Sequence, residues 1–212
     1  MPRVTAKICG LSTPETLDAA IAGGASHVGF VFFPKSPRNI SIDQAAALAG
    51  RVAGRAKIVG LFVDPEPAQI DVVRASVHLD ALQLHGEEHP ALVASLQMRH
   101  GIEVWKAVPV RTAADLAVSH KFRGHRILFD AKAPKGSDIP GGNGLRFDWT
   151  LLRDFRHTSP WLLSGGLDAR NVSEAVRITG ATLVDVSSGV ETAPGVKDVD
   201  KIAAFLKAVA QC

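Results

Sequence analysis

Two reactive side chains stand close together near the amino terminus. In Lys7-Ile8-Cys9-Gly10 an ammonium and a thiol are separated by one residue. If these residues form a β-strand, the alternation of side chains sends Lys7 and Cys9 to the same face. A neighbouring cation favours the thiolate and lowers the pKa of a cysteine, which is what a cysteine base needs near neutral pH. A lone cysteine in an apolar strand is more often a packed core residue, so its position has to decide.

A carboxylate offers the complementary chemistry. The segment Leu128-Phe129-Asp130-Ala131-Lys132 places Asp130 beside apolar residues, where it would suit a general acid. Its ordinary alternatives are a helix cap or an ion pair with Lys132. Together, Cys9 and Asp130 would supply a base and an acid for proton transfer.

Three glycine-rich stretches indicate an anion site. They are Ser164-Gly165-Gly166, Ser188-Gly189 and Gly141-Gly142-Asn143-Gly144. Glycines let backbone N–H groups approach a phosphate closely, and the start of a short extra helix would add its positive dipole end. Any one glycine pair is usually a turn, but the three stretches together favour a phosphosugar ligand.

Further polar residues follow the apolar runs. Arg38 stands in a loop stiffened by Pro34 and Pro37, and its guanidinium suits bidentate capture of a carboxylate. The alternative for Arg38 is a solvated loop charge. His85, in Leu82-Gln83-Leu84-His85-Gly86, would bind a hydroxyl or pack at the rim, and the sequence does not separate these two interpretations.

These residues must be positioned by a regular alternation of strands and helices. Short apolar runs rich in β-branched residues occur at 4–9, 27–33, 57–63, 81–84, 103–108, 126–130, 161–163 and 182–186. Segments with helical spacing lie between most of them, at 14–22, 43–52, 67–76, 90–99 and 112–120, with a shorter one at 149–155. Strands buried on both faces and separated by helices imply a parallel sheet with right-handed crossovers.

Eight such repeats predict an α/β fold of the (β/α)8 TIM-barrel type, with eight parallel strands in a single domain over residues 1–212. An open doubly wound sheet is the alternative, but the first strand is not followed by a GxGxxG fingerprint. In a barrel the carboxyl ends of all strands meet at one mouth. That rule brings together Cys9, Arg38, Asp64, His85, Asp130, Ser164, Asp185 and Ser188.

Composition narrows the class of protein. Of 212 residues, 46% are hydrophobic and 21% are charged, as in an ordinary globular protein. The first residues lack the apolar stretch of a secretory signal, and no run approaches the roughly 18 apolar residues of a membrane span. We therefore expect a cytoplasmic protein with no membrane partner, in which Cys9 and Cys212 are reduced thiols. A net charge of +3 from scattered lysines and arginines suits an anionic small molecule better than nucleic acid.

The motifs also carry a resemblance to a known family. They are KICGL at 7–11, GFVFFPKSPR at 29–38, LQLHG at 82–86, FDA at 129–131, LSGGL at 163–167 and DVSSGVE at 185–191. In their order and spacing the sequence resembles the phosphoribosylanthranilate isomerases over essentially the whole chain. The resemblance implies an Amadori rearrangement of N-(5-phosphoribosyl)anthranilate to the 1-deoxyribulose phosphate derivative, in tryptophan biosynthesis, without a metal or an organic cofactor.

The resemblance also implies a role for each candidate residue. Asp130 would protonate the ribose ring oxygen, and Cys9 would remove the C2′ proton. Arg38 would bind the anthranilate carboxylate, Asp185 would lie close to the sugar hydroxyls, and His85 is a further candidate for substrate binding. The phosphate would be held around Gly142, Asn143, Gly144, Gly165, Gly166, Ser188 and Gly189.

Two alternatives to this function have different requirements. One is a related sugar isomerase that acts on the aminoimidazole carboxamide ribotide of histidine synthesis, or on both substrates. The resemblance to that family implies a site with two aspartates, whereas the base here would be Cys9. A non-catalytic phosphosugar-binding barrel would need the glycine-rich loops but neither Cys9 nor Asp130. The sequence leaves both a monomer and a homodimer open.

Overall fold

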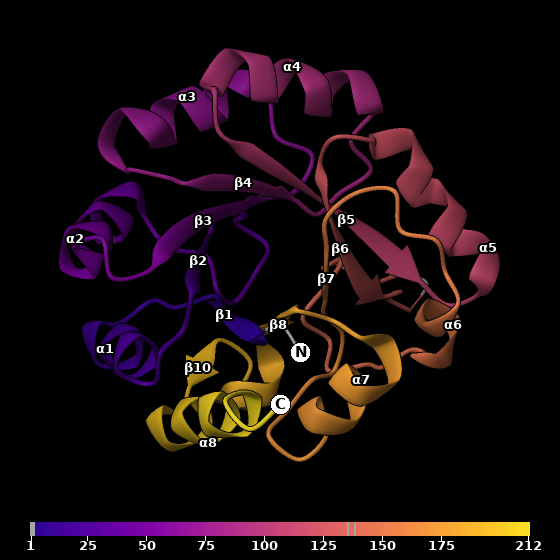
Figure 1. Cartoon of the computed structure of the whole chain (residues 1–212). Helices are drawn as coiled ribbons and strands as arrows, with labels where there is room; N and C mark the ends of the chain where they lie inside the picture. The colour runs from indigo at the N-terminus through magenta and orange to yellow at the C-terminus, as the bar shows by residue number, and fades with distance from the viewer. Residues whose placement is uncertain (1–2, 135, 138) are drawn as a thin grey trace.

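The barrel predicted from the alternating segments is confirmed. The computed structural model describes residues 3–134, 136–137 and 139–212; Lys135, Asp138 and the first two residues of the predicted domain lie outside the described residues. Eight parallel strands pair in chain order and close on themselves, with the helices arranged around them (Figure 1). They are β1 (Thr5–Cys9), β2 (His27–Val31), β3 (Lys57–Phe62), β4 (Ala81–Leu84), β5 (Glu103–Val110), β6 (Arg126–Ala131), β7 (Trp161–Leu163) and β8 (Leu183–Val186).

The surrounding helices begin where the sequence offers caps. The Ser41 hydroxyl accepts a hydrogen bond from the Gln44 backbone N–H at 3.1 Å, and Pro14 and Pro67 occupy first helical turns. The helices are α1 (Pro14–Ala22), α2 (Ile42–Val52), α3 (Pro67–Ser76), α4 (Pro90–His100), α5 (Ala113–Leu116), α6 (Thr150–Arg153), α7 (Val172–Thr179) and α8 (Val199–Val209).

One predicted helix is divided. The segment 112–120 forms α5 and then a 3-10 helix, η1 (Ala117–Phe122). The Ser119 hydroxyl donates to the Leu116 carbonyl at 2.7 Å, a local bond of the kind that competes with the α-helical pattern. The prediction of a single α-helix over this segment is therefore wrong.

The interior of the barrel is apolar near the amino ends of the strands and polar toward their carboxyl ends. Near the amino ends of the strands it is filled by Val59, Ala81, Trp105, Ala107, Leu128, Leu162 and Leu183. Two residues further along three of these strands come Gln83, Asp130 and Asp185, which the period of two turns to the same face. A larger apolar cluster packs the outside of the barrel against the helices. Inside the barrel, the layer of polar side chains therefore lies next to a layer of apolar side chains.

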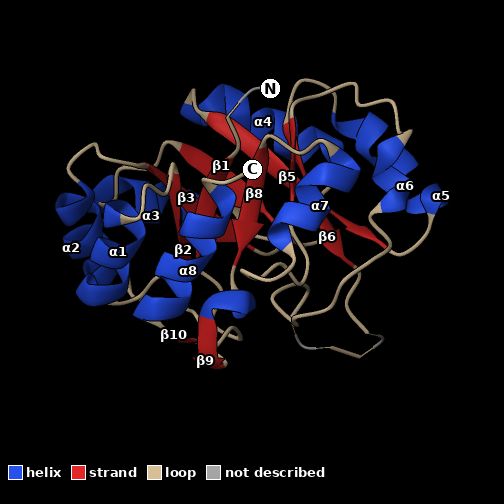
Figure 2. Ribbon diagram, turned by 60° about the horizontal axis from the view of Figure 1, so that its bottom comes forward, coloured by secondary structure: helices blue, strands red, loops and turns tan. Residues whose placement is uncertain are grey.

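The carboxyl end of the barrel carries the irregular structure. After β8 the chain forms a single 3-10 turn, η2 (Ser188–Val190), where a short helix was predicted, and then an unpredicted antiparallel hairpin of β9 (Glu191–Ala193) and β10 (Val196–Lys197). Figure 2 shows this hairpin and the long loop after β6 at one end of the barrel, with both termini toward the other.

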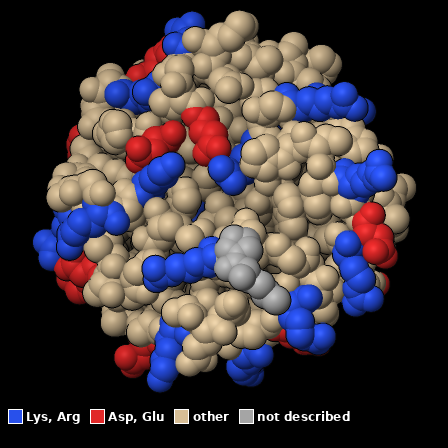
Figure 3. All heavy atoms as spheres, in the orientation of Figure 1, with Lys and Arg blue, Asp and Glu red and all other residues tan. Residues whose placement is uncertain are grey.

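The surface carries charges of both signs. On the face shown in Figure 3, lysine and arginine side chains are spread around the molecule, with aspartate and glutamate among them. Within the described part of the chain, no helix combines the length and the apolar character that crossing a membrane demands.

Candidate active site

Residues from the carboxyl ends of the strands line one cavity. Its volume is about 750 Å³, including its open mouth. The predicted site residues on its lining are Cys9, Arg38, His85, Asp130, Asp185, Gly142, Asn143, Gly144, Gly165, Gly166 and Ser188. Gly189 is not on the lining. A Cβ there would lie 1.9 Å from the Leu167 carbonyl oxygen, so this glycine lets the loop after β8 pack against the loop after β7.

Cys9 and Lys7 lie side by side on β1. A Cβ on Gly29 of the adjacent strand would be 3.0 Å from both the Cys9 Sγ and the Lys7 Nζ, so both side chains pack over this glycine. The Lys7 Nζ also lies 2.9 Å from Asp185 Oδ1, and both groups are buried. The strand alternation predicted for β1 therefore places the ammonium beside the thiol.

The protonation of this pair differs from the expectation. Burial raises the pKa of the Cys9 thiol, and the ammonium of Lys7 opposes this only in part. Burial lowers the pKa of Lys7, but the charges of Asp185 and Cys9 outweigh it and hold that pKa above its ordinary value. The neighbouring cation was evident from the sequence, but the burial of Cys9 away from water was not. The resting pair is a thiol beside an ammonium.

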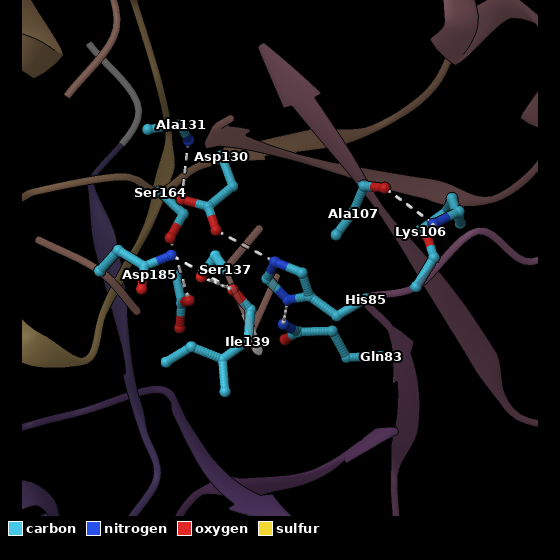
Figure 4. A network of polar contacts seen from close by, with 12 residues as sticks. Gln83, His85, Lys106, Ala107, Asp130, Ala131, Ser137, Ile139, Ser164 and Asp185 are labelled. Atoms are coloured by element: carbon cyan, nitrogen blue, oxygen red, sulfur yellow. Dashed lines mark hydrogen bonds and ion pairs between the residues drawn. The ribbon is translucent and has the colours of Figure 1, made fainter. Parts of the chain in front are cut away.

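Asp130 is held by His85 and by the backbone. Its Oδ1 accepts a hydrogen bond from the Ala131 N–H at 2.8 Å, and its Oδ2 lies 3.0 Å from the His85 Nε2 (Figure 4). On the other side of the ring, the Gln83 amide nitrogen lies 3.1 Å from Nδ1. An amide that donates to Nδ1 leaves the ring proton on Nε2, directed at Asp130. A Cβ on Gly141 would be 2.8 Å from Asp130 Oδ2, so the loop after β6 covers this pair closely.

The ion pair between Asp130 and Lys132, considered above as an alternative to a catalytic role, does not form. Lys132 pairs with Asp115 instead, with 3.3 Å between Nζ and Oδ1. The carboxyl group of Asp130 is 5% exposed and lines the cavity.

Arg38 is buried and already has a carboxylate partner. Its Nε and Nη2 each donate to one oxygen of Glu191 at 2.8 Å, and Nη2 also donates to the Gly142 carbonyl at 3.1 Å. The interpretation of Arg38 as a solvated loop charge is wrong. The bidentate edge of the guanidinium, which we expected to bind a ligand carboxylate, is occupied by Glu191. The two N–H groups of Nη1 donate to no residue that the structure describes.

Asp185 lines the cavity, is buried and is held by two side chains. It accepts from Lys7, as above, and from the Ser164 hydroxyl at 3.3 Å. Figure 4 shows Ser164 between Asp185 and Asp130. Its clearest contribution in this structure is to fix the ammonium of Lys7 beside Cys9.

The glycine-rich loops after β6, β7 and β8 meet on one side of the cavity. A Cβ on Gly144 would lie 3.7 Å from the Ser188 Oγ, and one on Gly166 would lie 2.6 Å from the Leu145 carbonyl oxygen. Gly165 and Gly166 have φ angles of 90° and 63°, a conformation that other residues rarely adopt. Close approach and backbone shape therefore both require glycine where the three loops converge.

Three residues of this constellation escaped the sequence analysis. Gln83 could have been found, because it precedes His85 by two residues and shares its strand face. Glu191 ends the DVSSGVE motif, but neither it nor Lys197 was assigned a role, because the partner of Glu191, Arg38, is 153 positions away. In residues 3–134, 136–137 and 139–212, no group of three or more His, Cys, Asp or Glu side chains is arranged to hold a metal ion.

Comparison with known proteins identifies, over nearly the whole chain, the same family that the motifs resemble. Residues 6–208 match the family described as N-(5'-phosphoribosyl)anthranilate (PRA) isomerase. A relative of that name from Rhodospirillum centenum is 55% identical over 98% of both chains, and one from Paramagnetospirillum magneticum is 51% identical over 97% of this chain and 96% of its own.

Solved structures agree with this. Phosphoribosyl anthranilate isomerase from Thermotoga maritima has a TM-score of 0.90 at 39% identity, covering 99% of this chain and all of its own. A second structure, of such an isomerase in complex with reduced 1-(o-carboxyphenylamino)-1-deoxyribulose 5-phosphate, has a TM-score of 0.85 at 38% identity, with 99% and 100% coverage. A third is described as mutually generated monomers of the dimeric T. maritima enzyme. The family match, the identity to these relatives and the shared barrel show that the chain belongs to the N-(5'-phosphoribosyl)anthranilate isomerase family.

Proposed function

We propose that this chain isomerises N-(5'-phosphoribosyl)anthranilate to 1-(2-carboxyphenylamino)-1-deoxy-D-ribulose 5-phosphate, a step of tryptophan biosynthesis, with Asp130 as the acid and Cys9 as the base. The observation that carries the proposal is that Cys9 and Asp130 line one cavity, each beside a different partner. The names of the relatives support the substrate, and one solved relative is described with a reduced form of this product.

Asp130 begins the reaction by giving its proton to the ribose ring oxygen. The C1′–O bond then breaks, and the lone pair of the anthranilate nitrogen forms a C=N bond, which gives an open-chain Schiff base. Asp130 is left as a carboxylate, which can accept from the Ala131 N–H and from Nε2–H of His85. Donors fixed before the reaction stabilise a charge that develops during it, without reorganisation.

Cys9 carries out the second proton transfer, at C2′ of the open-chain sugar. As a thiolate it removes the C2′ proton, and the electrons of that C–H bond form C1′=C2′ while the nitrogen regains its lone pair. The resulting enolamine loses its O2′ proton and gains one at C1′, which gives the ketone. Since the resting residue is a thiol, its proton must first pass to water in the open cavity, and the ammonium of Lys7 favours the thiolate that results.

The remaining residues bind the ends of the substrate. The free N–H groups of Arg38 Nη1 suit the anthranilate carboxylate, and the loops that contain Gly142, Gly165 and Ser188 suit the phosphate. Holding both ends fixes the sugar between the acid and the base, the arrangement that proximity effects require.

The test is turnover by the purified protein. We expect the fluorescence of N-(5'-phosphoribosyl)anthranilate to disappear with time, and no conversion of the aminoimidazole carboxamide ribotide of histidine synthesis. Conversion of the ribotide alone would assign the chain to the rival reaction, and binding without turnover of either substrate would leave a phosphosugar-binding barrel.

A further inference from the structure

A buried network of three charges lies behind the cavity. Glu191 accepts from Arg38 through both of its oxygens at 2.8 Å, and its Oε1 also lies 2.6 Å from the Lys197 Nζ. The side chains of all three residues are at most 6% exposed. Burial raises the pKa of Glu191, but Arg38 and Lys197 outweigh it, so that pKa is held below its ordinary value. The carboxylate is therefore charged.

Lys197 connects the network to Ser187 and, through it, to β1. The Lys197 ammonium donates to the Ser187 carbonyl at 3.0 Å and to its hydroxyl at 3.1 Å, and that hydroxyl donates to the Cys9 carbonyl at 3.2 Å. On α8, the Lys201 Nζ donates to the Glu191 carbonyl at 2.6 Å. The β9–β10 hairpin thus holds the carboxylate in a fixed place.

The geometry of the fork decides where Arg38 points. A bidentate pair through Nε and Nη2 fixes both the plane and the direction of a guanidinium, which is otherwise at the end of a flexible chain. A Cβ on Gly142, a lining residue, would lie 2.6 Å from Nη1, so the remaining edge faces the loop that closes the cavity. Two cations and one anion leave the network with one net positive charge, so Lys197 preserves the attraction for an anion that Glu191 alone would cancel.

We propose that Glu191, with Lys197, is a positioning residue for carboxylate recognition, because it orients Arg38 so that Nη1 meets the aryl carboxylate of the ligand. This inference rests on the proposed function of Arg38. Glu191 itself is not among the residues that line the cavity. Its effect should therefore pass entirely through Arg38 and depend on the ligand carboxylate.

The test compares two ligands by calorimetry. One is reduced 1-(o-carboxyphenylamino)-1-deoxyribulose 5-phosphate, and the other is the same molecule without the ring carboxylate. We expect Glu191→Gln to weaken binding of the first about tenfold or more and binding of the second less than about twofold, as for loss of one charge-assisted contact. Glu66→Gln is the control, since Glu66 is exposed and makes no side-chain cap bond on α3. In an Arg38→Ala background, Glu191→Gln should have no further effect.

A second variant guards against a loss of folding. Glu191→Asp keeps the charge but withdraws the fork by one methylene, and we expect the same selective loss. Equal weakening of both ligands, or additive effects in the double variant, would overturn the role of Glu191. A wild-type protein that binds neither ligand would instead contradict the proposed function.

Discussion

At the scale of single residues, the acid and the base have different surroundings. Asp130 is held by His85 and a backbone N–H, whereas Cys9 lies between Gly29 and Lys7. We expect Cys9→Ser and Asp130→Asn each to lower kcat at least about a hundredfold, because positioned proton-transfer groups contribute that much. Affinity for the reduced product analogue should change little. Steady-state kinetics on the fluorescent substrate measure the first quantity and calorimetry the second; near-normal kcat in either variant would contradict the mechanism.

The thiol itself gives a second residue-scale prediction. Because burial raises the pKa of Cys9 above its ordinary value of 9.0, its thiolate fraction should still be increasing above pH 9. In a Cys212→Ser background, which removes the exposed thiol, the rate of inactivation by iodoacetamide should rise from pH 7 to pH 9.5 without a plateau. A plateau reached by pH 7 would show that Lys7 dominates over burial, as the sequence alone suggested.

At the scale of elements, the loops after β7 and β8 act as one unit. A Cβ on Gly189 would collide with the Leu167 carbonyl oxygen, so Gly189→Ala must push the two loops apart. We expect it to lower the free energy of unfolding by about 1–3 kcal/mol and to raise KM about tenfold, because the phosphate loops separate. Urea unfolding and steady-state kinetics measure the two effects.

Gly50→Ala is the matched control for this change. Gly50 is exposed on α2, and a Cβ there would have no neighbour within 4 Å. Alanine should therefore stabilise the helix by about 0.5–1 kcal/mol and leave KM unchanged. If both glycine variants raised KM alike, packing between the two loops would not explain the effect of Gly189.

The same elements show what the sequence could and could not predict. The bounds of α1 and α3 were predicted to the residue, because proline in the first turn and the helical spacing are local signals. The β9–β10 hairpin was missed, since its strands have three and two residues, too short for a visible alternation. Seven of the eight residues predicted at the mouth from their place at strand ends line the cavity, but Asp64 does not; its carboxylate accepts from the Glu87 backbone N–H at 2.7 Å. The partner of Arg38 was not predicted, because only closure of the barrel brings Glu191 to it.

At the scale of the whole molecule, burial of the barrel interior links stability to pH. His27 of β2 points inward, and its ring packs edge-on against Trp105 with 5.2 Å between centroids. Burial, followed by the charge of Lys7, lowers the pKa of His27 from 6.5 to about 4. The folded protein therefore keeps this ring neutral at pH values where an unfolded chain would protonate it.

The sign of the pH effect follows from this difference. At pH 7 the ring is neutral in the folded protein and mostly neutral in the unfolded chain, so its contribution to stability is nearly complete. As the pH falls below 6.5 the unfolded chain binds a proton that the folded protein refuses until about pH 4, so stability is lost across this window. Between pH 7 and pH 5 the loss from His27 should be up to about 2 kcal/mol. We expect His27→Gln to remove that part of the pH dependence in urea unfolding followed by tryptophan fluorescence, while His78→Gln, at an exposed histidine, should retain it. If His27→Gln lost as much stability as the wild type over this range, the acid sensitivity of the barrel would have to arise from other buried groups.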